Sequence, residues 1–284
     1  MVNSIHYFEG RNLVIATKHK KEFVIGPPLK AAFGLDFFSS DSLDTDILGT
    51  FSGEIERLNK PIDAARMKCN MAMDIHQVDM AVSSEGSFGP HPQIFFLPAD
   101  EEYLMFMDRK HELEVFVKTV TTNTNYSSIT LTSTEYLQEF LTRVKFPSHA
   151  LILKKSENDI TRIEKGIVCE KTLFDRVEFY LNLYGACYLE TDMRAMFNPT
   201  RMEVIKNLVD QLIVDMNRIC PKCHFPGFSV SDVVRGLLCS NCLWPTKSVK
   251  EIIYGCKKCG HRSIEMNTEL KKYEEPMYCD FCNP

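Results

Sequence analysis

Four Cys-x-x-Cys pairs in the last quarter of the chain constrain its fold more than any other feature of the 284 residues. Two thiolates separated by two residues can turn onto one cation, and a second pair then closes a tetrahedron with Zn–S distances of about 2.3 Å. In a cytosolic chain, clustered pairs of this kind favour metal over disulfides. We therefore predict two zinc ions (Zn2+), with the ligands Cys220, Cys223, Cys239, Cys242, Cys256, Cys259, Cys279 and Cys282.

The spacing of these pairs allows two ways of sharing the ions. Sequential pairing is simpler and gives one ion to C-x2-C-x15-C-x2-C at 220–242 and the other to C-x2-C-x19-C-x2-C at 256–282. In the cross-braced alternative, the first and third pairs share one ion. Four thiolates complete the coordination in both cases, which indicates structural ions and leaves His224 and His261 as less favoured ligands.

The segment 220–284 is expected to form a small module, a double four-cysteine zinc ribbon. Residues 225–230 and 233–238 have the pattern of a two-strand ribbon with a glycine turn. A ribbon of this size cannot bury a core. Zinc binding, worth roughly 10–16 kcal/mol, would then make it fold.

Composition restricts the function classes only weakly. No apolar run approaches the 18 residues of a membrane span, and the polar start at 1–4 lacks the order of a secretory signal, so we expect a cytoplasmic protein. From Cys220 onward, nine Lys and Arg stand against seven Asp and Glu, a surplus too small to predict nucleic-acid binding by charge. Contact of the tail with nucleic acid or a protein partner stays an alternative, with the candidate residues Lys257, Lys258, Arg262, Trp244 and Tyr254.

The first 219 residues are predicted to form an α/β domain, with a mixed sheet, an antiparallel hairpin and helices on both faces. Apolar periodicity predicts strand, loop and helix at the start of the chain, and a hairpin later. The three scattered cysteines, Cys69, Cys169 and Cys187, are interpreted as small buried hydrophobes. The expected strands are 12–17, 80–83, 103–107, 113–117, 151–154 and one ending near 189; the expected helices are 29–32, 54–74, 134–143, 171–183 and 198–218, the last capped by Asn198.

Two polar stretches follow the expected strands. Thr17, Lys18 and Lys20 come directly after the first strand, where hydroxyl, ammonium and helix N–H groups can receive a phosphate; the alternative is a solvated basic turn. The stretches 44–54 and 83–91 are rich in carboxylates, hydroxyls and glycines, which are also common turn residues. Glu85, helped by Glu54 or Asp46, is the candidate ligand for Mg2+, which prefers one or two carboxylates together with substrate phosphates.

A third polar cluster lies before the last helix. Glu190 and Asp192 alternate with Arg194 and are followed by Asn198 and Arg201. Two carboxylates beside two arginines form either a catalytic or anion-binding cluster, with Arg194 on phosphate, or an ion-pair network at the helix start.

Four stretches of the chain carry a resemblance to a known family: 44–57, 83–92, 190–202 and 220–245. The family they resemble is bacterial and is defined only as a domain of unknown function, in which a glycine- and acid-rich domain precedes a cysteine-rich tail. The resemblance covers most of the chain and implies no particular activity.

A fainter resemblance is to the inosine/xanthosine triphosphate pyrophosphatase-like fold. The matching residues are Ala16 to Lys20 for its phosphate loop, Ala64 to Lys68 for its helix, and Val82 to Gly86 for its acidic strand end. His19 stands at the place of the usual asparagine, and Ser83 and Ser84 replace paired acids before a single Glu85. The resemblance implies a Mg2+-dependent nucleoside triphosphate pyrophosphatase or a nucleotide-binding protein, whose fold can survive where activity has not. The rival is a non-enzymatic zinc module.

Overall fold

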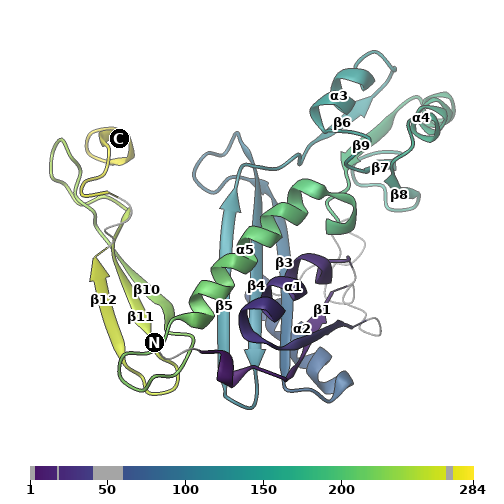
Figure 1. Cartoon of the computed structure of the whole chain (residues 1–284). Helices are drawn as coiled ribbons and strands as arrows, with labels where there is room; N and C mark the ends of the chain where they lie inside the picture. Colours follow the sequence, from purple (N-terminus) through teal and green to yellow (C-terminus); the bar gives the residue numbers. More distant parts are fainter. Residues whose placement is uncertain (1–3, 18, 41–59, 267–270) are drawn as a thin grey trace.

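The computed structural model describes residues 4–17, 19–40, 60–266 and 271–284 (Figure 1). Its largest sheet has the strand order β2-β1-β3-β4-β5. β1 runs parallel to β2 and β3, whereas β4 is antiparallel to β3 and β5. The predictions of a partly parallel sheet and of a hairpin are therefore confirmed. The strands are β1 (Asn12–Ala16), β2 (Asp36–Ser39), β3 (Met80–Pro90), β4 (Pro98–Asp108) and β5 (Leu113–Thr121).

Helices cover both faces of this sheet because its side chains alternate between two apolar cores. Leu13 and Ile15 face a core shared with α1 (Glu22–Phe33) and α5 (Pro199–Asn217). Val14 and Ala16 face the opposite core, which is shared with α2 (Pro61–His76). α2 begins at Pro61, which fixes a helical φ at the first position, after Lys60 in an extended conformation; the predicted start at Glu54 lies outside the described residues.

Residues 128–191 form a second, antiparallel sheet in the order β6-β9-β7-β8, inserted between β5 and α5. It has its own core, built by Leu151, Leu153, Leu189 and the inner faces of its two helices. Figure 1 shows this sheet beyond the N-terminal end of α5. Its elements are β6 (Ser128–Leu131), α3 (Leu137–Arg143), β7 (Leu151–Lys154), β8 (Ile163–Ile167), α4 (Glu170–Tyr184) and β9 (Cys187–Thr191).

α5 connects the three parts of the molecule. The side chain of Asn198 accepts a hydrogen bond from the Arg201 backbone N–H at 3.0 Å, which confirms the predicted cap. From there the helix crosses the large sheet and ends at the cysteine module (Figure 1). Short 3₁₀ helices lie at Ser4–Tyr7, Ala195–Phe197 and Pro276–Tyr278.

The cysteine module is a three-stranded antiparallel sheet in the order β10-β11-β12. β10 (Ser229–Arg235) pairs with β11 (Val249–Gly255), and β11 pairs with β12 (Arg262–Met266). The predicted two-strand ribbon was wrong, because Val230 and Val233 lie in the same strand and the partner strand comes after the second cysteine pair.

The module packs against the α/β part through a shared apolar core. Cys220, Phe228 and Cys256 lie in the same buried cluster as Leu113 of β5 and the inner face of α5. The backbone comes so close at Gly227, with φ +78°, that an added Cβ would lie 2.6 Å from Leu113 Cδ1. Only glycine satisfies both the left-handed conformation and this approach.

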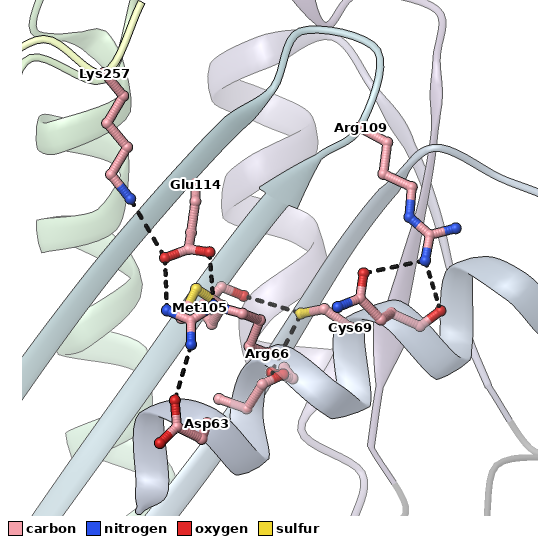
Figure 2. Close-up of polar contacts among 10 residues, drawn as sticks. Asp63, Arg66, Cys69, Met105, Arg109, Glu114 and Lys257 are labelled. Atoms are coloured by element: carbon pink, nitrogen blue, oxygen red, sulfur yellow. Dashed lines mark hydrogen bonds and ion pairs between the residues drawn. The ribbon is translucent and has the colours of Figure 1, made fainter. Parts of the chain in front are cut away.

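An ion-pair chain strengthens the same contact (Figure 2). Arg66 of α2 donates to both carboxylate oxygens of Glu114 at 2.9 Å, and Lys257 from the module reaches Glu114 Oε1 at 3.3 Å. Glu114 on β5 therefore links a helix of the body to a cysteine loop of the module.

Two further sequence expectations can be compared with the structure. Cys69 and Cys187 are buried as expected, whereas Cys169 is exposed at the N-cap of α4, so that interpretation was wrong for Cys169. Within the described residues, no helix combines the length and the apolar character that crossing a membrane requires.

Candidate functional site

The eight cysteines of the module gather into two groups of four. One group joins Cys220 and Cys223 to Cys256 and Cys259; the other group contains Cys239, Cys242, Cys279 and Cys282. The first pair thus shares its site with the third, and the second with the fourth. Sequential pairing was wrong, and the cross-braced alternative is the arrangement found.

Strand direction explains the cross-brace. Because β10 and β11 are antiparallel, Ser229 at the start of β10 lies opposite Gly255 at the end of β11. The pair before β10 and the pair after β11 are thereby brought to the same end of the sheet. The pair that follows β10 is carried to the other end, where the chain arrives after β12.

Both groups have dimensions that fit a tetrahedral metal ion. Sγ–Sγ distances are 3.7 and 3.6 Å in the first group and 3.8 and 3.6 Å in the second. A tetrahedron of sulfurs about 2.3 Å from zinc has edges of about 3.8 Å. His261 instead stacks on Phe228, and neither group includes a histidine. Two four-cysteine clusters that could hold metal ions are therefore present.

A second candidate site lies where β1 ends, at the carboxyl edge of the parallel strands. Thr17 Oγ1 accepts a hydrogen bond from the His19 backbone N–H at 3.2 Å, and Lys20 takes a left-handed φ of 58°. Lys21 is the N-cap of α1 and is only 5 % exposed. The chain therefore turns sharply from strand to helix, as anion-binding loops of α/β proteins do.

Two lysines reach β3 beside this turn, one from each face of the sheet. Lys21 Nζ donates to Ser84 Oγ at 2.7 Å. Lys68 of α2 forms an ion pair with Glu85. Burial, followed by the positive charge of Arg201, lowers the pKa of Lys21 to about 7.

The neighbouring strand β4 and helix α5 contribute a buried guanidinium and two carboxyl groups. Arg201 Nε donates to Glu102 Oε1 at 2.5 Å, with both side chains fully buried. A Cβ at Gly86 would lie 2.4 Å from the Arg201 guanidinium, so a side chain opposite Glu102 would have to displace that buried group. Burial and the adjacent Glu102 carboxylate raise the pKa of Asp100 to about 8.

Arg194 approaches the same region from the segment after β9. The buried carboxylate of Asp192 accepts from Arg194 Nη2 at 2.6 Å and from the Gly166 backbone N–H at 3.0 Å. The guanidinium also lies over the Phe197 ring, 4.6 Å from its centroid. Asp192 therefore orients Arg194.

The pKa of His19 depends on its burial and on the charges of the side chains around it. Burial lowers its pKa to about 3, and the charges that act in the same direction are those of Lys21, Arg201, Arg194 and Lys68. The charges that act on this imidazole come from four separate segments, and three of them belong to ion pairs: Lys68 with Glu85, Arg194 with Asp192, and Arg201 with Glu102. Lys20 and Arg194 are solvent-accessible cations beside this turn, and such groups can attract an anion.

The structure brings some of the predicted site residues together and separates others from them. Thr17, Lys20, Glu85, Asp192 and Arg194 lie in or beside the cluster around His19. Glu190 lies apart, because its carboxylate pairs at 2.7 Å with Lys154 of β7, in the second sheet. Lys18, Asp46 and Glu54 lie outside the described residues.

No cluster of three metal-binding side chains other than the two cysteine groups occurs in residues 4–17, 19–40, 60–266 and 271–284. Lys21, Lys68 and Ser84 were not among the candidate site residues of the sequence analysis, although all three lie in or next to stretches that it singled out, and Glu102 was missed altogether. The first could have been found from its position at the start of the helix, but the others become neighbours only through the sheet.

A broad hollow of about 600 Å3 lies at the opposite edge of the sheet, bordered by Arg11, Asp74 and Arg109. Arg109 donates to the Asp74 carboxylate at 2.5 Å, and Arg11 to Asp108 at 2.5 Å. Arg109 also donates to the backbone and side-chain oxygens of Asn70, the two Arg109 contacts drawn in Figure 2. The charged groups of the hollow therefore satisfy one another.

A comparison with protein-family models shows which family the chain belongs to. The model of a domain of unknown function, DUF6671, matches residues 68–284. The chain belongs to this family. The match includes Ser84, Glu102, Arg201 and both cysteine groups, and begins after His19 and Lys21. No match to a curated protein was found.

Paired cysteine substitutions test the cross-brace. Cys223→Ser with Cys259→Ser removes two ligands from one cluster, so the purified protein should retain one metal ion per chain. Cys223→Ser with Cys242→Ser removes one ligand from each cluster, so both ions should be weakened. Native mass spectrometry and elemental analysis would measure the stoichiometry. One firmly bound ion in the second variant and none in the first would contradict the cross-brace.

Proposed function

We propose that the cluster around His19 binds the phosphate groups of a small molecule, and that the protein hydrolyses a phosphoanhydride bond in it. The observation that carries the proposal is the turn from β1 into α1, where Thr17 accepts from the His19 N–H and Lys21 is the N-cap, and the charges of Arg194, Arg201 and Lys68 also act on His19 there. Phosphate groups are the ligands that cationic side chains and a helix start bind best.

The exposure of the cluster supports access from solvent. Lys20 is exposed, His19 is half-buried and the Arg194 side chain is 26 % exposed, whereas Lys21 and Arg201 are buried behind them. An incoming triphosphate would therefore meet Lys20 and Arg194 first. The buried cations would contribute through their field, which is weakly screened at this depth.

Magnesium enters this proposal with the substrate. Because Glu85 already holds Lys68, we assign Mg2+ to the phosphate oxygens of a nucleoside triphosphate and not to a preformed carboxylate site. The cysteine clusters take zinc in the proposal, since four thiolates at these distances suit its tetrahedral preference, and their closed coordination gives the ions a structural role.

A panel of nucleoside triphosphates with Mg2+ tests this function. We expect release of phosphate or pyrophosphate from at least one of them and a rise in melting temperature with its non-hydrolysable analogue. Arg194→Ala should weaken binding of that analogue by roughly tenfold, because a charge-assisted hydrogen bond is lost.

Arg109→Ala is the matched control, since it removes an arginine at the opposite edge of the sheet and should leave the affinity unchanged. A panel that gives neither product nor a thermal shift would rule the proposal out. Equal losses in both variants would place the binding site elsewhere.

A second candidate function is favoured by the outer end of the cysteine module. Trp244 and Phe281 stack with ring centroids 6.0 Å apart, although they are 57 % and 68 % exposed. Of the other predicted contacts, Lys257 and Tyr254 face the body: Lys257 pairs with Glu114, and Tyr254 is buried under Arg218. Exposed stacked rings suit unpaired bases, which bind to aromatic side chains.

Trp244 is the only tryptophan of the chain, so its fluorescence reports directly on this surface. Binding of a single-stranded oligonucleotide should quench the emission, and Phe281→Ala should raise the dissociation constant by about tenfold, since base stacking contributes about 1–3 kcal/mol. Phe179→Ala on α4 is a control with an exposed ring far from the module. Unchanged emission at low salt would dismiss this candidate.

A further inference from the structure

Ser84 and Lys21 form a contact that phosphate binding alone does not require. Lys21 Nζ lies 2.7 Å from Ser84 Oγ, and each side chain is 5 % exposed. Both ends of the contact are rigid, because Lys21 is the residue from which α1 starts and Ser84 lies in the middle of β3, paired with Leu104. A hydroxyl is thus held against an amine at the edge of the cation cluster.

The alternation of the strand makes this arrangement specific to one of two adjacent serines. Ser83 points to the α2 face, where its Oγ donates to the Ala65 carbonyl at 2.7 Å and accepts from Cys69 at 3.3 Å. Ser84 points to the α1 and α5 face, where its Oγ meets Lys21. Adjacent residues of one strand therefore have different chemistry, and Ser83 is an internal control.

We propose that Ser84 is a nucleophile and that Lys21 is the base that accepts its proton. The substrate class rests on the proposed function, a phosphoanhydride held by the surrounding cations. Serine is a weak nucleophile unless a neighbouring base takes its proton, and lysine serves as that base in some serine hydrolases.

The reaction balances with water as the only other reactant. Ser84 Oγ forms a bond to phosphorus while its proton passes to the Lys21 amine, and the anhydride P–O bond breaks. The leaving phosphate takes the proton from the Lys21 ammonium. Water then attacks the phosphoserine, gives a proton to Lys21, and Ser84 Oγ leaves with that proton, which restores both side chains.

The surroundings of Lys21 allow it to be a neutral amine near pH 7. Burial lowers its pKa to about 7, the cations Arg201 and Lys68 act in the same direction, and the carboxylates Glu102 and Glu85 oppose them. A base with a pKa near the working pH is the most effective kind. The rate at which Ser84 reacts should therefore depend on the protonation state of Lys21.

The test uses diisopropyl fluorophosphate, which reacts with activated serines by phosphorylating Oγ and releasing fluoride. The full chain, with its metals bound, should gain one diisopropylphosphoryl group at Ser84, located by peptide mass spectrometry. Labelling should be roughly tenfold faster at pH 8 than at pH 6, as a base with pKa about 7 requires. Lys21→Met, which keeps the length of the buried stem, should abolish it.

Ser83→Ala is the matched control and should label at the rate of the unsubstituted chain. A native far-ultraviolet spectrum and melting temperature are required of each variant, and Lys21→Arg, which keeps the charge without a usable base, is the second variant should Lys21→Met not fold. A folded, metal-bound chain that gains no label at Ser84, or labelling that persists without Lys21, would overturn the proposal.

The outcome is independent of the nucleotide panel, because the probe contains no anhydride and needs no Mg2+. Labelling of Ser84 with an inert panel would retain the serine–lysine pair and refute the phosphohydrolase. Turnover of a nucleotide by Ser84→Ala at the unsubstituted rate would retain the phosphohydrolase and refute the nucleophile.

Discussion

The buried ion pair between Arg201 and Glu102 is the interaction on which the rest of the structure depends. Arg201 also donates to the Met193 carbonyl at 2.5 Å, and its guanidinium lies 5.0 Å from the centre of the Phe88 ring. One side chain in the first turn of α5 thus joins the large sheet to the segment that leaves the second sheet. Removing one partner of such a pair leaves an uncompensated buried charge, which typically costs about 3–5 kcal/mol.

The same pair connects architecture with electrostatics. Its position at the start of α5 directs that helix across the sheet toward the cysteine module, whose first cluster shares the core of the body. Its charge is also one of the four that act on His19. A structural contact therefore also contributes to the electrostatic field at the candidate site. A substitution of Arg201 would change both the fold and the proposed chemistry.

Local patterns were enough to predict the elements that local chemistry determines. The strand at Asn12, the β4–β5 hairpin and the capped start of α5 were predicted because alternation, turn residues and a capping side chain lie within a few positions of each other. The cysteine ligands were predicted for the same reason, since two thiolates two residues apart already form half of a metal site.

Long-range neighbours were not predictable from those patterns. The cross-brace depends on the direction of β10 and β11, and the Lys21–Ser84 contact joins residues separated by 63 positions through the order of the strands. The predicted cluster of Glu190 with Asp192 and Arg194 separated because β9 ends at Thr191: Glu190 lies within the strand and pairs with Lys154 of the adjacent β7, whereas Asp192 and Arg194 lie in the segment that follows. Spacing in the sequence identifies the residue types, whereas pairing of the strands decides which of them meet.

The central claim is that the cationic side chains around His19 make an anion site, and the response of the His19 titration to an added anion tests it. Nuclear magnetic resonance of the imidazole, assigned with His19→Gln, should show a neutral ring down to about pH 4, because its pKa is lowered to about 3. Tripolyphosphate should raise that pKa, since a bound anion offsets the surrounding positive charges. A His19 that titrates at the ordinary value near 6.5 and ignores tripolyphosphate would contradict the account.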